Sequence, residues 1–416
     1  MKKECLSLSL LFVLLNGLLS AQENKTQSFS LQECIDYALK NNEGVKAVEL
    51  QKDYYKQIKH TSTELPKTTA MFTQGQFNSI YKYDNNITIA QSTPFPGLFG
   101  AQNKLANAQL KNSEYALKSE KANLIYHIKT TYYSLIFVET LKHLLLKEDS
   151  IYEDFANVTA IKYRNGEASL LEKTSTETQV MDIKNQLFEN EEDIINYQIH
   201  LKTLMNCGKN INIKDSDMEN NYLTIVLDSA ADLSHPILKQ LNEQVNISER
   251  QKKVEIFKSL PDFTVGYFNQ TIYGPANVFG EDYFLTTKNR LQGFQVGMTL
   301  PIWYYPFKAK INAADINKDI AQHNYNYQSN LLQGEYKQTV NQYLKYQNSI
   351  TYYKKKALDN STLMITEALD YYKKKEIGYV EYLEIVSQAL SIKCNYLKVI
   401  HENNLTVLKL QYLLEN

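Results

Sequence analysis

Apolar residues recur every seven positions in two stretches, one in each half of the chain. The first series consists of Leu110, Leu117, Leu124, Val138, Leu145 and Tyr152, with the polar Thr131 filling the remaining position. The second series consists of Tyr336, Tyr343, Ile350, Ala357, Met364 and Tyr371. A sustained seven-residue repeat predicts helices that pack as coiled coils. The Asn, Gln, Lys and Tyr residues between these positions indicate that other faces of the same helices meet water.

Glycine and proline are concentrated in two short windows, which leaves the rest of the chain free to form long helices. Of the 22 glycines and prolines, six fall in residues 66–100 and nine in residues 261–306, while residues 101–165 contain none. At 1.5 Å per residue, a helix of roughly 65 residues is about 100 Å long. Few globular cores accommodate such a rod, and periodicity alone favours a soluble helical scaffold.

The two windows rich in glycine and proline instead show the period-two alternation of strands. Phe294, Val296, Met298 and Leu300 alternate with polar or small residues, as do Phe263, Val265 and Tyr267. We predict strands at about 262–272 and 291–300, and weaker ones at about 68–77 and 86–93. Runs of about 8 to 11 residues match the length of tilted transmembrane β-strands.

The two halves of the chain share one layout, because each reads helix, hairpin, very long helix, turn and helix. Leu65-Pro66 before the first hairpin corresponds to Leu260-Pro261 before the second, and Tyr163 corresponds to Tyr372. A duplicated layout indicates a repeat architecture. Four strands cannot close a membrane barrel, and open sheet edges are not tolerated in lipid, so several copies of the chain must contribute strands.

Composition and charge exclude several classes of protein. A net charge of -1 gives no electrostatic footprint for nucleic acid. Lys2 and Lys3, an apolar stretch over residues 6–19 and the small pair at 20–21 predict a signal peptide at 1–21, and therefore an exported protein. The cysteines show no CxxC spacing, no HExxH or GxSxG string occurs and no phosphate loop is present, so we expect no enzyme activity, no cofactor and no metal site.

Three segments and the duplicated order give the chain a family resemblance over essentially its whole mature length. They are "SLQECIDYALKNNEGVKAVELQ" at 30–51, "STPFPGLFGAQNKLANAQ" at 92–109 and "LPIWYYPFKAKINAADI" at 300–316. The chain resembles the TolC family of outer-membrane efflux proteins. The resemblance implies a mixed α and transmembrane β fold, in which a homotrimer forms a twelve-stranded outer-membrane β-barrel continued by an α-helical periplasmic tunnel.

The resemblance also divides the mature chain. It implies a first structural repeat at 22–207 with a tip at about 163–170, an equatorial segment at 208–234, and a second repeat at 235–416 with a tip at about 373–380. The tips are helix-turn-helix turns at the periplasmic end of the tunnel. Family members have a Gly in each tip turn and an acid six residues later. Gly166 and Glu172 fit this pattern, whereas Lys375 occupies the second Gly position and leaves open a differently built turn there.

Candidate site residues follow from the same resemblance. Glu381 and Glu384 fall on the acids that form rings at the closed tunnel entrance, although two solvated glutamates at an acidic helix start would look the same. Tyr372 and Glu172 fall on positions of a tip-to-tip hydrogen bond that holds the tunnel shut, while Ile377 replaces a basic partner of that lock. The adaptor-docking positions are Arg164, Asn165, Gly166, Ala168, Ser169, Leu170, Lys374, Ile377, Gly378 and Tyr379. A tip cap made by the tunnel's own core would use the same residue types as Leu170 and Tyr379.

Two classes of function remain from the sequence. The first is a trimeric exit duct in the outer membrane of a Gram-negative bacterium, with its tunnel in the periplasm. Its partners would be a periplasmic adaptor and an inner-membrane pump of the RND type. Heavy-metal or other cation efflux is the favoured cargo, with drug efflux and type I secretion left open. The second class is a periplasmic coiled-coil scaffold without a pore. Such a scaffold would not need two hairpins of alternating strands at matching places in the two halves.

Overall fold

The computed structural model describes residues 27–214, 218, 221–226 and 235–414. The chain divides into two compact units. Unit 1 consists of residues up to 47, 119–235 and 332 onward, and unit 2 consists of residues 48–118 and 236–331. The predicted signal peptide lies outside the described residues, as does part of the predicted equatorial segment.

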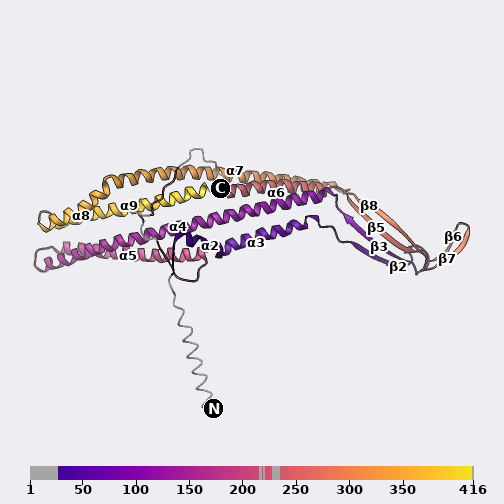
Figure 1. The fold of residues 1–416 in the computed structure, drawn as a ribbon, viewed down its shortest axis with the longest axis horizontal. Helices are drawn as coiled ribbons and strands as arrows, with labels where there is room; N and C mark the ends of the chain where they lie inside the picture. Colours follow the sequence, from indigo (N-terminus) through magenta and orange to yellow (C-terminus); the bar gives the residue numbers. More distant parts are fainter. Residues whose placement is uncertain (1–26, 215–217, 219–220, 227–234, 415–416) are drawn as a thin grey trace, which may run out of the picture. The chain divides into compact units, whose positions relative to one another are not determined.

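The first half of the chain begins and ends with a short strand. It also contains a long helical hairpin, which Figure 1 shows. Its elements are β1 (Gln27–Phe29), α2 (Leu31–Asn41), α3 (Glu43–Ile58), the 3-10 turn η1 (Lys59–Thr63), β2 (Thr69–Gln74), β3 (Asn85–Thr93), α4 (Gly97–Arg164), α5 (Leu170–Met205) and β4 (Ile211–Ile213). The 68 residues of α4 confirm the predicted long helix.

The second half repeats this order with one insertion and one interruption. Its elements are α6 (Pro236–Lys258), β5 (Asp262–Thr271), β6 (Gly274–Val278), β7 (Glu281–Leu285), β8 (Arg290–Thr299), α7 (Tyr304–Tyr352), the π-helical segment η2 (Tyr353–Ala357), α8 (Leu358–Lys373) and α9 (Tyr379–Leu413). The four long strands begin and end within three residues of their predicted positions. No helix in the described ranges is long and apolar enough to cross a membrane.

Unit 2 contains a four-stranded antiparallel sheet in the order β2-β3-β5-β8. The two hairpins therefore meet through β3 and β5, where Ile89 pairs with Tyr267. On the outer sides, β2 and β8 each have one neighbour in the sheet. The sheet thus has two outer edges that other strands could extend.

A third, smaller hairpin extends from the β5–β8 connection and was not predicted. It consists of β6 and β7, which join at Phe279 and Gly280. Both turn residues have positive φ, of 57° and 92°, as a two-residue hairpin turn requires. The sequence signal is the string "NVFGED" at 277–282, in which a Gly and flanking polar residues mark a turn.

The seven-residue series of α4 is the buried seam of that helix. Leu117, Leu124, Val138, Leu145 and Tyr152 are all buried, and so is the polar member Thr131, while Leu110 at the start of the series is partly buried. Towards the α4–α5 turn, the seam packs into a cluster that also contains residues of α5, α8 and α9. The predicted coiled-coil face is confirmed here.

The second series is correct only as far as η2. Tyr343, Ile350 and Ala357 are buried, but Tyr371 is 42% exposed, while Ile365 and Tyr372 pack against the cluster instead. A π-turn holds one residue more than an α-turn. The buried face beyond η2 therefore moves by one residue, from the predicted 364 and 371 to 365 and 372.

Candidate functional site: the two helix-turn-helix tips

The first tip ends α4 with two hydrogen bonds that define a Schellman motif. The Glu167 N–H donates to the Lys162 carbonyl at 2.8 Å, and the Gly166 N–H donates to the Tyr163 carbonyl at 3.1 Å. This pattern requires the left-handed conformation at Gly166, whose φ is 74°. A Cβ at this position would meet no atom within 4 Å, so the requirement is one of backbone conformation alone.

The second tip ends α8 with the same two bonds. The Glu376 N–H donates to the Tyr371 carbonyl at 3.0 Å, and the Lys375 N–H donates to the Tyr372 carbonyl at 3.1 Å. Lys375 takes the left-handed conformation with φ of 61°. The departure from glycine therefore does not change how the turn is built, and Lys375 carries a backbone strain of about 1–2 kcal/mol.

The helices that leave the two turns begin differently. At the start of α5, Ser169 and Glu172 form a capping box: the Ser169 N–H donates to the Glu172 carboxylate at 2.6 Å, and the Glu172 N–H donates to the Ser169 hydroxyl at 3.1 Å. Hydrogen bonds from the Ser169 N–H and then from the Ser169 hydroxyl to the carboxylate hold the pKa of the Glu172 carboxyl below its usual value. At the start of α9 the cap residue is Gly378, which has no side chain to accept such a bond.

A cluster of aromatic side chains packs the two tips against each other. The Phe155 ring of α4 lies 4.8 Å from the Tyr382 ring, 4.9 Å from the Tyr379 ring and 5.2 Å from the Tyr372 ring, measured between centroids. Phe155 and Tyr382 are buried. Burial raises the pKa of the Tyr379 and Tyr382 hydroxyls. One apolar core therefore packs against both turns.

Polar contacts join the tips above this core. The Lys162 ammonium donates to the Tyr372 hydroxyl at 2.9 Å and lies 4.9 Å from the centre of the same ring. The Tyr379 hydroxyl is hydrogen-bonded to the Thr176 hydroxyl and donates to the Glu172 carbonyl at 3.4 Å. A cavity of about 330 Å³ lies between the turns.

Tyr372 and Glu172, the predicted lock, thus bind other groups within this chain. Tyr372 has Lys162 as its polar partner, and the Glu172 carboxylate is engaged in the capping box. A bond between Tyr372 and Glu172 stays a prediction for the assembled protein. Lys162 supplies a cation beside Tyr372, which sequence reasoning missed because it looked for that cation at Ile377.

The predicted docking residues separate into an exposed and a packed group. Arg164, Asn165, Gly166, Ser169, Leu170, Lys374 and Gly378 are exposed, and Ala168 is partly buried. Ile377 and Tyr379 are partly buried and pack against the core cluster, and the docking role of both stays a prediction. Leu171, which was not singled out, is 79% exposed beside Leu170 at 60%.

Glu381 and Glu384 both lie exposed on the first turns of α9. Their spacing of three residues places them on one face of the helix. Glu381 stands where Glu172 stands in α5, three residues after the cap, but Gly378 offers it no hydroxyl partner. The Glu381 carboxylate is therefore not held by a capping box.

Known structures with this fold are outer-membrane channels. CusC matches with a TM-score of 0.76 and 11% identity over 94% of this chain and 92% of its own, in a study of folding and transmembrane channel formation. The Campylobacter jejuni CmeC outer membrane channel matches with a TM-score of 0.69 and 17% identity over 95% and 90%. The open state of the Neisseria gonorrhoeae MtrE outer membrane channel matches with a TM-score of 0.74 and 14% identity over 92% and 88%.

Neither the family models nor the curated proteins gave a match to the sequence. The structural matches cover nearly the whole of both chains, so the predicted resemblance to TolC-type outer-membrane proteins is confirmed at the level of the fold. The three matched structures named above are described as channels.

Proposed function

We propose that this chain is the subunit of a trimeric exit duct in the outer membrane of a Gram-negative bacterium, with its helices forming a tunnel in the periplasm. The observation that carries the proposal is the two-sided character of the β2-β3-β5-β8 sheet. The likeness in fold to outer-membrane channels supports it.

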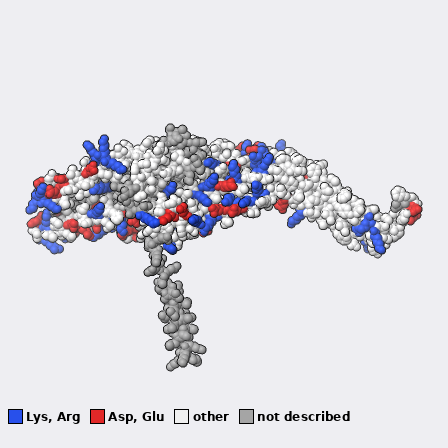
Figure 2. All heavy atoms as spheres, viewed as in Figure 1, with Lys and Arg blue, Asp and Glu red and all other residues white. Residues whose placement is uncertain are grey.

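One face of the sheet is apolar and uncovered. Cross-strand pairing aligns Ala70, Ile89, Tyr267 and Phe294 in one row, and Val265 pairs with Val296 in the next. Phe294 is 82% exposed and Val296 is 80% exposed. Figure 2 shows few charged side chains over the sheet, and the strands' own charges, Asp262 and Arg290, stand at strand starts. Such a face suits lipid.

The opposite face of the sheet carries mostly small and polar residues, with Met71, Phe268 and Leu291 as its large apolar members. Thr264 pairs with Gly297, and Gly266 pairs with Gln295. The Ser92 and Thr264 hydroxyls share a hydrogen bond of 2.9 Å across β3 and β5. A polar face opposite a lipid-compatible face is the pattern of a strand that lines an aqueous channel.

The outer edges of β2 and β8 require further strands in a membrane, because unpaired backbone groups there cost several kcal/mol each. Three copies of a four-stranded sheet supply twelve strands, which is within the known range of outer-membrane barrels. Pairing of β2 in one copy with β8 in the next would satisfy both edges.

The tips would provide the periplasmic contacts of a tripartite efflux system. The exposed positions from Arg164 to Leu171 and at Lys374 and Gly378 would receive a periplasmic adaptor, which would connect the duct to an inner-membrane pump of the RND type. Contact of Lys162 with Tyr372 would help to hold the resting tips together. Glu381 and Glu384 of three copies would form acidic rings at the entrance, which favours cations as cargo.

The test is single-channel current across a planar bilayer that contains the purified mature protein. We expect a pore that prefers cations, and we expect the preference to fall in the variant Glu381→Gln, Glu384→Gln. The matched control is Glu189→Gln, Glu192→Gln, which removes two exposed acids with the same spacing from α5. The control should keep the preference of the parent protein.

Two other outcomes would change the proposal. A pore whose selectivity is the same in both variants keeps the duct and removes the acidic entrance. Folded protein that carries no current would favour the periplasmic scaffold. Heat-dependent mobility on a gel of isolated outer membranes would then decide whether the chain reaches that membrane at all.

A further inference from the structure

A cavity of about 380 Å³ opens on the surface of unit 1, where His143 and Lys147 are exposed, and has no part in the proposed duct function. Its wall is formed by α4, α8 and α9. The residues that argue for a ligand are His143 and Lys147 of α4 and Lys393 of α9. The volume falls within the range of small-molecule sites.

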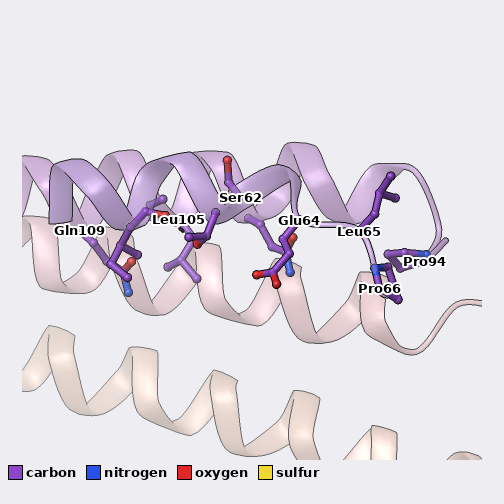
Figure 3. A pocket seen from close by; sticks show the side chains of 11 residues that line it. Ser62, Glu64, Leu65, Pro66, Pro94, Leu105 and Gln109 are labelled. Carbon is purple, nitrogen blue, oxygen red and sulfur yellow. Dashed lines mark hydrogen bonds between the residues drawn. The ribbon is translucent and has the colours of Figure 1, made fainter. Parts of the chain in front are cut away.

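The charge in this cavity has one sign. The described residues that line it include two lysines and a histidine, and no acid. The cavity between the tips differs, because Lys162 and Lys375 there face Glu167 and Glu172. The cavity between η1 and α4 in unit 2 differs too, because Glu64 is the one charged side chain in its wall (Figure 3).

Lys147 and Lys393 also differ from neighbouring lysines in their partners. Lys142 pairs with Glu191 at 2.8 Å, and Lys184 of α5 pairs with Glu153. Among the ion pairs between described residues, none includes Lys147 or Lys393. Two ammonium groups without carboxylate partners at one concave site attract an anion.

The rest of the wall selects the kind of anion. Leu144, Leu358 and Leu397 give the cavity an apolar surface. Leu358 directly follows η2 (Tyr353–Ala357), and single π-turns inside α-helices occur frequently at functional sites. A ligand that matches both features has a compact apolar body and a carboxylate head.

We propose that the cavity between α4, α8 and α9 binds a small organic carboxylate, with Lys147 and Lys393 holding the head group and the three leucines holding the body. The site is made by side chains of a single copy. It therefore does not depend on the duct function or on the number of copies in the assembly.

The test uses para-trifluoromethylbenzoate as the probe and fluorine NMR of the probe with the purified full mature protein as the measurement. The neutral para-trifluoromethylbenzamide has nearly the same shape and corrects for partition into detergent. We expect the carboxylate to bind with a Kd at least about tenfold lower than that of the amide, as charge-assisted hydrogen bonds predict.

Three variants locate the binding. Lys147→Gln with Lys393→Gln should raise the Kd of the carboxylate about tenfold and leave that of the amide unchanged. Lys147→Arg with Lys393→Arg retains both charges and should restore most of the affinity, which shows that a loss in the Gln variant is not a loss of folding. Lys184→Gln removes a lysine that has a carboxylate partner elsewhere in unit 1 and should have no effect.

Equal binding of carboxylate and amide to the parent protein would overturn the proposal. So would carboxylate binding that is the same in the parent protein and the double Gln variant. In either case the two lysines do not bind the carboxylate. Their aliphatic chains then cover the leucines, and their ammonium groups stay in water.

Discussion

The two tips are the same turn built from different residues. Both end a helix with the same pair of hydrogen bonds and a left-handed residue, Gly166 in the first and Lys375 in the second. The next helix begins with Ser169 in one case and Gly378 in the other. The first tip therefore has a residue suited to the left-handed position and a cap with a side-chain hydrogen bond, whereas the second has a lysine at the left-handed position and a cap without that bond.

The difference shows that residues outside the second turn must stabilise its geometry. Lys375 is held in an unfavourable conformation, so other interactions must offset that cost. The stack of Phe155 on Tyr372, Tyr379 and Tyr382 can do so, because it fastens both ends of the second turn to the first half of the chain. We expect the first tip to be stable by its own sequence and the second to depend on that core.

The largest effect should follow from Phe155→Ala. Removing a buried ring from the shared core should cost about 3–5 kcal/mol. Hydrogen exchange, read by mass spectrometry on peptides from each tip, should show faster opening in both, with the larger change around Lys375. The control is Phe188→Ala, because Phe188 of α5 is exposed and its loss should alter neither tip. A change confined to the first tip would contradict dependence of the second tip on this core.

A smaller effect should follow from exchanging the left-handed residues. Gly166→Ala should destabilise the first tip by about 1–2 kcal/mol, because φ of 74° suits glycine and there is no steric clash to add. Lys375→Gly should stabilise the second tip by about 1 kcal/mol for the same reason. Local opening free energies from hydrogen exchange measure both.

Lys375→Ala separates this backbone effect from the loss of a charge. It keeps the strain and removes the ammonium group, so the second tip should open as it does in the parent protein. Stabilisation by Ala as large as that by Gly would show that the charge, and not the backbone, destabilises the turn.

The smallest effect should follow from the caps. Ser169→Ala should cost about 1 kcal/mol at the start of α5, and Gly378→Ser should gain at most a few tenths, because glycine is itself a fair cap. The Glu172 pKa is lowered in the folded protein, so its contribution is present above the usual carboxyl pKa and is lost as pH falls through the lowered value. Acid should therefore loosen the start of α5 more than the start of α9. Equal acid sensitivity in hydrogen exchange would contradict this role of the capping box.

The sequence predicted those features that depend on local patterns. The strands followed from alternation such as Phe294, Val296 and Met298, and the long helix α4 followed from its apolar spacing and the absence of glycine and proline. The hairpin of β6 and β7 was missed because its five-residue strands are too short for alternation to stand out.

Other features depend on packing that no local pattern encodes. The π-turn at Tyr353–Ala357 lies in a lysine run with no glycine or proline, so the shift of the buried face to Ile365 and Tyr372 had no signal. The conformation of Lys375 was also hidden, since lysine does not favour positive φ. The partners of Tyr372 and Glu172 depend on which side chains the fold brings together, and Lys162 lies on α4, whereas the resemblance placed the cation at Ile377 in the second tip.

The open edges of the sheet have a consequence for genetics. If β2 of each copy pairs with β8 of the next as proposed, a chain with a damaged β2 or β8 prevents closure of the whole trimer that it joins. In a cell that makes intact and damaged chains together, most assemblies would contain at least one damaged copy. Mutations in these two strands should therefore be dominant, whereas null alleles that make no chain should be recessive.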